Sequence, residues 1–420
     1  MPKKLWALTF AVGLMLFGSS AHAVDWSVSG FGTLGYTYEN EADLGYRRDI
    51  TRSADIEDNG IFNNDSNVGV QLDLTFDHHW SITSQWLLDN SIDYDLDEMT
   101  ELAFVRYEPN ENWDFRAGRV GVSAYAAADS RHIDYAHLWV RPPQELYGGI
   151  VFNSLDGVGF TYYSNNANLN WSASAEYGRI TQMGEVPELQ EKYRAKLKDV
   201  LSLSFEVEQD KWRWQLSYAH VGSLSVNNGP SLQSLQNQIA QIANSNIPLL
   251  SEDAASLYDA LVLDDEEVTY LQAAVTYFDS EWTAQSELFR ITTDKNSIPQ
   301  GYGGYVLLGK AFERLTPYMM YGVFHVDQAP YQKALDWSLF NPALVPLQEG
   351  AIAGINSVRI EQSTYSLGLR WDVASQVAVK AQLDYVEIES FGYGLWATPA
   401  SRQGEERDAL VLTLNMNFIF

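Results

Sequence analysis

The sequence predicts an all-β fold, a transmembrane sixteen-stranded antiparallel up-and-down β-barrel. Sixteen segments alternate apolar and polar residues with a period of two, which is typical of strands with one apolar face. The connections between these segments alternate between short and long. Beyond the first 23 residues no apolar run reaches the ~18 residues of a membrane helix, whereas barrel strands need only ~9 to 11.

The chain opens with a predicted signal peptide, residues 1–23, which we expect to be cleaved. Lys3 and Lys4 precede an apolar run, and the Ala-His-Ala sequence at residues 21–23 is a typical cleavage site. Removing these two of the 27 basic residues leaves 25 against 55 acidic ones, a formal charge of about −30. We expect residues 24–420 to form a single exported barrel domain.

The composition excludes several classes of protein. The chain has no cysteine, so a disulfide scaffold, thiol chemistry and a cysteine-ligated metal are excluded. The acidic excess argues against nucleic-acid binding, which depends on Lys and Arg meeting phosphates. Residues 55–60 match the front half of a calcium loop, but Ser66 stands where the closing glutamate belongs. We expect no metal site and no cofactor.

The alternating segments run from the start of the mature chain to its last residue. The predicted strands are residues 27–38, 66–76, 80–88, 99–108, 113–120, 157–164, 169–178, 200–208, 211–221, 268–278, 281–292, 302–312, 316–326, 363–373, 376–388 and 410–420. On the last strand one face carries Leu410, Leu412, Leu414, Met416, Phe418 and Phe420. We expect such apolar rows to face lipid.

The connections indicate how the barrel is oriented. Seven are short and eight are long, and the two kinds alternate without exception. The long ones run from about nine to about 46 residues. Tight turns at one end and long loops at the other are typical of membrane-spanning barrels, and an even strand number brings both chain ends to the turn side.

A tryptophan follows five of the short turns, each at the start of the next strand. An aromatic ring at that height lies in the lipid headgroup layer. We expect one girdle at the turn end of the barrel, formed by Trp80, Trp113, Trp171, Trp212 and Trp282.

The face opposite the apolar rows carries many charges, which are tolerated only in contact with water. A barrel of sixteen strands is wide enough to enclose an aqueous channel. We therefore expect a water-filled lumen, lined by Asp73, Gln85, Arg106, Arg116, Glu176, Arg213, Lys310, Arg370, Lys380 and Asp384.

Over residues 24–420 the chain resembles the Gram-negative outer-membrane porins. The resemblance rests on the opening strand SGFGTLGYTY, the segment VRYEPNENWDFRAGRV and the terminal strand ending on Phe420. It implies a homotrimeric, non-enzymatic outer-membrane channel for passive diffusion of small hydrophilic solutes and ions. It also implies outer-membrane lipid and lipopolysaccharide as neighbours, and makes Phe420 part of the signal read by the barrel-assembly machinery.

The resemblance further implies that the third long loop folds into the channel and sets its narrowest point. In such porins, loop carboxylates face basic residues on the wall, and the field between them sorts ions. The acidic candidates are Asp129, Asp134 and Glu145, and the basic wall candidates are Arg106, Arg116, Arg370 and Lys380. The loop also carries its own Arg131 and Arg141, which departs from that pattern and leaves ordinary lumen or loop charges as an alternative. The acidic total favours a preference for cations.

The fifth long loop contains apolar residues at helical spacing, which are Leu232, Leu235, Ile239 and Ile242, then Ala254, Leu257 and Leu261. A helical pair here would act as a partial lid, or as a surface cap without a gating role. The alternative function is a substrate-selective channel narrowed by loops three and five.

A non-conducting structural or adhesive barrel and a barrel hydrolase are less favoured. A hydrolase needs a serine, a histidine and an acid within hydrogen-bond reach. The strand histidines His220 and His325 lie on distant strands, with no evident serine at the same height.

Overall fold

The computed structural model describes residues 24–41, 43–52, 60–92, 94–149, 153–166, 169–295, 298 and 300–420. The predicted signal peptide and residues 55–59 of the half calcium loop lie outside the described residues. Among the residues that are described, no helix combines the length and the apolar character needed to cross a bilayer.

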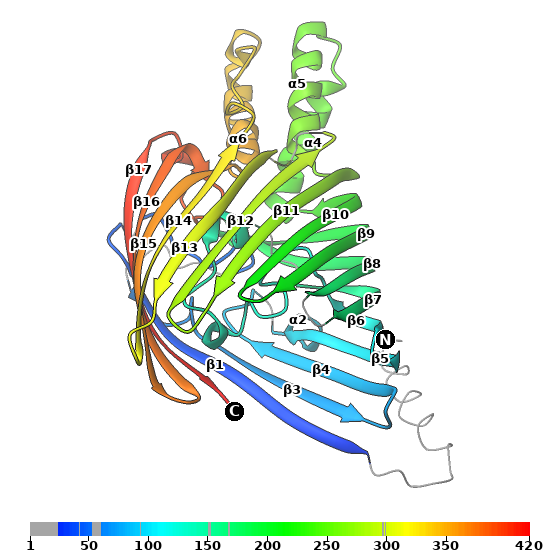
Figure 1. The fold of residues 1–420 in the computed structure, drawn as a ribbon. Helices are drawn as coiled ribbons and strands as arrows, with labels where there is room; N and C mark the ends of the chain where they lie inside the picture. The colour runs from blue at the N-terminus through cyan, green and yellow to red at the C-terminus, as the bar shows by residue number, and fades with distance from the viewer. Residues whose placement is uncertain are drawn as a thin grey trace.

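One antiparallel sheet closes on itself to form a barrel (Figure 1). Consecutive strands pair with each other, and pairing of the first strand with the last closes the ring. One of the seventeen strands in the described part of the chain has only two residues, so the barrel has sixteen strands, as predicted. The strands are β1 (Asp25–Glu39), β2 (Gly60–Ile61), β3 (Asn67–Thr75), β4 (Trp80–Leu88), β5 (Thr100–Asn110), β6 (Trp113–Gly121), β7 (Ser154–Asn166), β8 (Leu169–Val186), β9 (Glu191–Gln209), β10 (Trp212–Asn227), β11 (Glu266–Phe278), β12 (Trp282–Thr293), β13 (Gly301–Lys310), β14 (Leu315–Val326), β15 (Ile360–Ala374), β16 (Val377–Tyr393) and β17 (Arg407–Ile419).

The strands β8 and β9 are longer than predicted, because residues 179–199 extend them instead of forming a long fourth loop. A short 3-10 turn, η2 (Pro187–Leu189), lies between them. The pairing register shifts between Gly178 and Ile180, and Asp199 opposite has a φ of 51°. Such a bulge reverses which alternate residues point inward and which point outward. The regular alternation used to predict the strands therefore ends at the bulge.

The outer face of the barrel carries an apolar belt. Along β17, Leu412 and Leu414 are exposed whereas Val411 and Thr413 are buried, which confirms the alternation predicted for the terminal strand. Exposed belt residues on other strands include Val158, Phe160, Leu203, Phe205, Leu216, Leu271, Leu288, Met319 and Leu367. A band of this kind around a closed barrel is a lipid-contacting surface.

The last residue of the chain completes the seam of the barrel. The Phe420 amide donates to the Gly30 carbonyl at 3.0 Å, and the Gly30 amide donates to the Phe420 carbonyl at 3.0 Å. The Phe420 ring covers Gly30, where an added Cβ would lie 2.3 Å from the ring Cζ. Glycine therefore leaves the ring room to lie across the seam.

The inner face is only partly wet, which corrects the expectation of a lumen lined by water throughout. Trp139 and Tyr147, from the connection between β6 and β7, belong to one buried cluster with Tyr305, Leu307 and Tyr318 of β13 and β14. The connection carries enough apolar residues to form a core inside the barrel, so this side of the lumen is dry.

Lys310 corrects the predicted lining of the lumen. It shares the outward face with the exposed Leu308, and its Nζ lies 4.8 Å from the centre of the Trp282 ring. A lysine at a strand end is stable on the outer face because a cation is attracted to an aromatic ring and reaches the headgroup layer.

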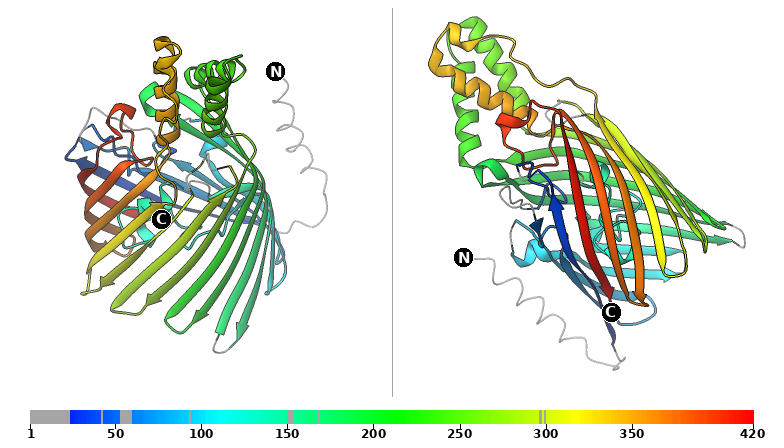
Figure 2. Two further views of the ribbon diagram at one scale, coloured as in Figure 1. Left: turned by 90° about the horizontal axis from the view of Figure 1, so that it is seen from above. Right: turned by 90° about the vertical axis from the view of Figure 1, so that its left-hand side faces the viewer.

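Helices project beyond the loop ends of the strands (Figures 1 and 2). The predicted helices in the fifth long loop are confirmed as α4 (Pro230–Ala243) and α5 (Pro248–Leu261). They pack with α6 (Val345–Asn356) of the seventh long loop around the buried Trp337. The three helices therefore share one small core, and the lid role stays a prediction. Two shorter helices are α2 (Leu96–Met99) and α3 (Gln144–Tyr147).

Candidate pore constriction

The connection from β6 to β7, which we call L3, crosses the inside of the barrel (Figure 2). On one side the Tyr147 hydroxyl donates to Glu287 of β12 at 2.6 Å. On the other side Arg141 Nη1 donates to Thr413 of β17 at 2.6 Å. Because β12 and β17 lie on different parts of the ring, L3 spans the lumen, as a constriction loop requires.

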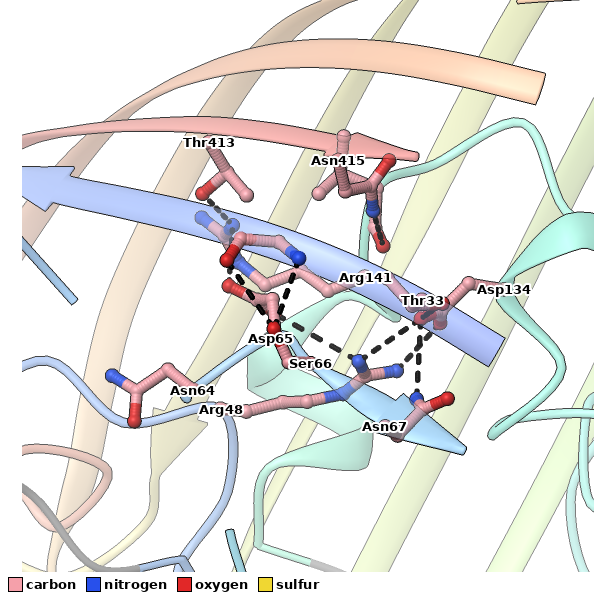
Figure 3. A network of polar contacts seen from close by, with 12 residues as sticks. Thr33, Arg48, Asn64, Asp65, Ser66, Asn67, Asp134, Arg141, Thr413 and Asn415 are labelled. Atoms are coloured by element: carbon pink, nitrogen blue, oxygen red, sulfur yellow. Dashed lines mark hydrogen bonds and ion pairs between the residues drawn. The ribbon is translucent and has the colours of Figure 1, made fainter. Parts of the chain in front are cut away.

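An alternating row of charges fastens L3 to the wall and to L1, the connection from β1 to β3 (Figure 3). Arg48 Nη2 lies 2.7 Å from Asp134 Oδ1, and Arg48 Nη1 lies 3.8 Å from Asp65 Oδ1. Arg141 Nη1 lies 3.9 Å from Asp65 Oδ2, and the Thr33 hydroxyl donates to Asp134 at 2.8 Å. Each buried charge thus has an opposite charge or a hydrogen bond beside it, which burial requires.

The electrostatics of Arg48 follow from this arrangement. Burial disfavours the charged guanidinium, but the neighbouring Asp134 favours it more strongly and raises the pKa of Arg48 above its usual value. The residue therefore stays a cation and holds L1 and L3 together.

Two of the predicted wall cations bind the backbone of L3. Arg370 Nη1 donates to the carbonyls of Tyr135 and His137 at 2.7 and 2.9 Å. Lys380, which is fully buried, donates from Nζ to the carbonyls of Asp134 and Trp139 at 2.5 and 2.9 Å. These two cations position the loop.

Two of the predicted acidic residues are also buried between L3 and the wall. Asp134 belongs to the charge row described above. Glu145 accepts hydrogen bonds from Gln362 at 2.7 Å and from the Thr364 hydroxyl. Burial raises the pKa of Glu145 above its usual value, because few charges balance it there.

The remaining predicted charges reach the water of the lumen. Asp129 of L3 is exposed. On the wall, Asp114 lies between the two predicted arginines, 3.4 Å from Arg106 Nε and 3.7 Å from Arg116 Nε. The Arg106 side chain keeps 34% of its surface exposed although it points inward. The structure thus divides the predicted set into charges that hold the loop and charges that face water.

Further charges on β9 and β10 belong to the wet side. Arg213 contacts Glu208 and lies 3.6 Å from Glu206, and all three side chains are partly exposed. Asp129 is near enough to Glu206 to act on it electrostatically. The alternation of the strands predicts that Arg213 points inward, but the sequence does not connect it with L3.

Arg48 and Asp65 of L1 were missed, because a partner on another loop leaves no periodic signal. The two histidines of L3 are structural. His137 Nε2 donates to the Ser130 carbonyl at 3.0 Å and its ring stacks on Trp139, with 4.5 Å between ring centres. Burial lowers the pKa of His137 to about 4 and that of His132 well below its usual value, so both are neutral at neutral pH.

The predicted girdle tryptophans begin strands next to the short turns. Trp80, Trp113, Trp212 and Trp282 are the first residues of β4, β6, β10 and β12, and all four are exposed. Trp171 is the third residue of β8. Their place at the turn end agrees with a girdle, and their role there stays a prediction.

No protein-family model matches the chain, and no curated protein matches it. Solved structures that are similar include OmpF of Salmonella typhi in complex with daunomycin, at 10% identity and a TM-score of 0.52, covering 96% of this chain and 99% of that one. An OmpT of Vibrio cholerae lacking loop L8 is similar at 11% identity and a TM-score of 0.51. The match covers 94% of this chain and 99% of that one. The anion-selective porin from Comamonas acidovorans is similar at 8% identity and a TM-score of 0.50. The match covers 94% of this chain and 100% of that one.

The class follows from these matches and from the closed ring of strands. The chain has the sixteen-stranded antiparallel barrel fold of the outer-membrane porins.

Proposed function

We propose that this chain is an outer-membrane porin, a water-filled channel through which small hydrophilic solutes and ions diffuse passively. One observation carries the proposal. Inside a closed barrel with an apolar outer belt, inward-facing charges such as Arg106 and Arg213 keep exposed surface, so water reaches them beside L3. A water-lined path next to a fixed loop is what passive diffusion requires.

We further propose a preference for cations. The charges that we assign to the wet side of the lumen are four acids and three bases, namely Asp73, Asp129, Glu206 and Glu208 against Arg106, Arg116 and Arg213. An excess of fixed negative charge raises the local concentration of cations.

The proposed channel is not an enzyme. The strand histidines are placed unfavourably for hydrolysis, since His220 contacts Thr269 at 3.3 Å and His325 lies 3.8 Å from Glu361. Both belong to the outward row of their strands, because their cross-strand neighbours there are Thr269 and the exposed Tyr302. A nucleophile in the lumen would have no histidine base from these strands.

The proposal also includes partners that follow from the family resemblance. We expect a homotrimer in outer-membrane lipid with lipopolysaccharide, inserted by the barrel-assembly machinery with Phe420 as part of the signal. Cross-linking of the protein in native membranes, read as monomer, dimer and trimer bands, tests the assembly.

Single-channel conductance in a planar bilayer under a salt gradient tests the channel. We expect large, stable steps and a reversal potential on the cation side. Folded protein that gives no steps would contradict the channel, and a reversal potential on the anion side would contradict the cation preference. Heat-denatured protein in the same detergent is the control.

A substrate-selective channel is the second candidate, favoured by a polar cavity of about 90 Å³ at the loop end. Its lining includes Asp49, Arg52, Glu101, Arg131 and His132. Liposome swelling with a series of sugars and amino acids separates the two functions. Rates that fall smoothly with solute size support diffusion, and one class that departs from the series supports selectivity.

A further inference from the structure

Four basic side chains stand in a row on the outer face of β9, at its loop end. Lys192, Arg194, Lys196 and Lys198 occupy alternate positions and are all exposed. Leu197, between the last two, is buried in the cluster that L3 forms with the inner wall. The four cations therefore point away from the lumen, and we call them the basic stripe.

The basic stripe continues a lipid-facing row of the same strand. Beyond the bulge at Asp199 the outward positions are odd-numbered, and Leu203 and Phe205 are exposed there. Tyr177 on β8, which pairs with Leu201 and is also exposed, marks the boundary between the two rows. An aromatic residue at the end of an apolar row is typical of the level of the lipid headgroups. The stripe begins just beyond that level.

The neighbouring strands leave most of the stripe without an opposite charge. Lys196 lies opposite Thr181 of β8 and Ser225 of β10, and Lys198 lies opposite Ser223. Arg194 lies opposite Met183 and Asn227, and Lys192 lies opposite Glu185. Within the described part of the chain, Lys196 and Lys198 have no side-chain hydrogen bond and no ion pair.

Unpaired cations are unexpected on this protein, which has 55 acidic and 27 basic residues. Arg290, on the outer face of β12, shows the usual arrangement, because its guanidinium binds Asp327 through two hydrogen bonds at 3.0 and 2.5 Å. Charge that is unpaired within the protein is available to an external anion.

We propose that the basic stripe binds phosphate groups of the lipid headgroups in the leaflet at the loop end of the barrel. Lipid acyl chains contact Leu203 and Phe205, so the phosphates of the same lipids lie at the height of Lys198 and above. Alternate residues of a strand are ~7 Å apart, so Lys196 and Lys198 are close enough together to suit a headgroup with more than one phosphate. The proposal rests on the membrane placement in the proposed function, and does not depend on conduction.

The test compares lipid binding by three forms of the protein. The stripe variant is Lys196→Gln with Lys198→Gln. The matched control is Arg290→Gln with Lys333→Gln, which also removes two positive charges from the loop end of the barrel. Native mass spectrometry of detergent-purified protein counts bound diphosphoryl lipid A and bound phosphatidylcholine. We expect the stripe variant to bind diphosphoryl lipid A about tenfold more weakly, the control to bind like the unchanged protein, and phosphatidylcholine to bind all three alike.

Further measurements distinguish lipid phosphate from free phosphate, and a loss of binding from a loss of folding. The Lys196→Arg, Lys198→Arg variant should bind like the unchanged protein, and heat-modifiable gel mobility shows that each variant is folded. Equal lipid A binding by the stripe and control variants would overturn the proposal. So would lipid A binding that inorganic phosphate abolishes at equal phosphate concentration, which would assign the stripe to free phosphate.

Conductance should be the same in all forms, because the stripe is outside the lumen. A barrel that conducts nothing but loses lipid A in the stripe variant would support the stripe and contradict the channel.

Discussion

The guanidinium of Arg48 contacts both carboxylate oxygens of Asp134, with Nη2 2.7 Å from Oδ1 and Nη1 3.3 Å from Oδ2. The two residues are 86 positions apart and both are buried. A two-point contact of this kind fixes orientation as well as distance. L1 therefore holds L3 at a defined place inside the barrel.

Asp134→Asn should loosen L3. Removing one partner of a buried ion pair costs about 3–5 kcal/mol, because the other charge stays buried. We expect faster hydrogen exchange of L3 amides, with unchanged exchange in the strands. Arg402→Gln is the control, since it breaks a more exposed pair with Asp43 and should leave L3 unchanged. Equal exchange in both variants would contradict an anchoring role.

Asp129→Asn should reduce the preference for cations. Asp129 is exposed on L3, so its charge acts on ions in the lumen. We expect the reversal potential under a salt gradient to move toward the anion side. Asp210→Asn is the control, because Asp210 lies in a turn at a φ of 55°, a conformation that asparagine tolerates. The same shift in both variants would mean that total charge, and not the place of Asp129, decides.

Arg106→Gln should move the reversal potential in the opposite direction. The residue points into the lumen beside Asp114, and its removal leaves that carboxylate less compensated. Arg314→Gln, in an exposed turn, serves as the matched loss of a positive charge. No change in the Arg106 variant would place the ion path away from β5 and β6.

Acid should weaken the packing of L3 through His137. Its pKa falls from 6.5 to about 4 because burial, and then Lys380 and Arg48, disfavour the imidazolium, although Asp134 and the Ser130 carbonyl favour it. A histidine with a lowered pKa stabilises the fold fully above 6.5, and the contribution is lost as the pH falls from 6.5 toward 4. The difference between these two pKa values corresponds to a loss of about 3 kcal/mol in the free energy of unfolding.

Thermal unfolding between pH 7 and pH 4 measures this effect. The His137→Gln variant should show a flatter dependence than the unchanged protein, because glutamine does not titrate and still donates to the Ser130 carbonyl. Parallel curves would assign the acid sensitivity to other groups.

Phe420→Ala should impair assembly more than the finished barrel. The backbone bonds to Gly30 remain, whereas the ring that covers Gly30 is lost. We expect less barrel in the membrane of producing cells, and similar thermal stability of the protein that does insert. Phe312→Ala, an exposed aromatic residue after β13, is the control. A normal yield of the Phe420 variant would remove its proposed role in the signal.

Local periodicity predicted the barrel well, since β17 alternates as its sequence does and the short turns lie where expected. It failed at Asp199, because a bulge reverses the alternation within one residue. It also placed Lys310 inside the barrel. Lys310 ends β13 and lies on the outer face, over the Trp282 ring.

The candidate site was predicted less completely than the strands. Alternation shows that Lys380 points inward, but not that L3 covers it. The contacts of Arg48 with Asp134 and of Glu145 with Gln362 join distant segments, and no local pattern encodes them. Separation into buried anchors and exposed charges depends on the path of L3, which only the tertiary structure defines.

The seam between β1 and β17 is closed from the inside as well as by the pairing of the two strands. Thr33 of β1 donates to Asp134, and Arg141 donates to Thr413 of β17, so one loop touches both sides of the seam from within. Separating the two strands, which would expose their edges, therefore also requires these contacts of L3 to break. The loop proposed to narrow the channel thus also makes opening of the barrel between its first and last strands more costly.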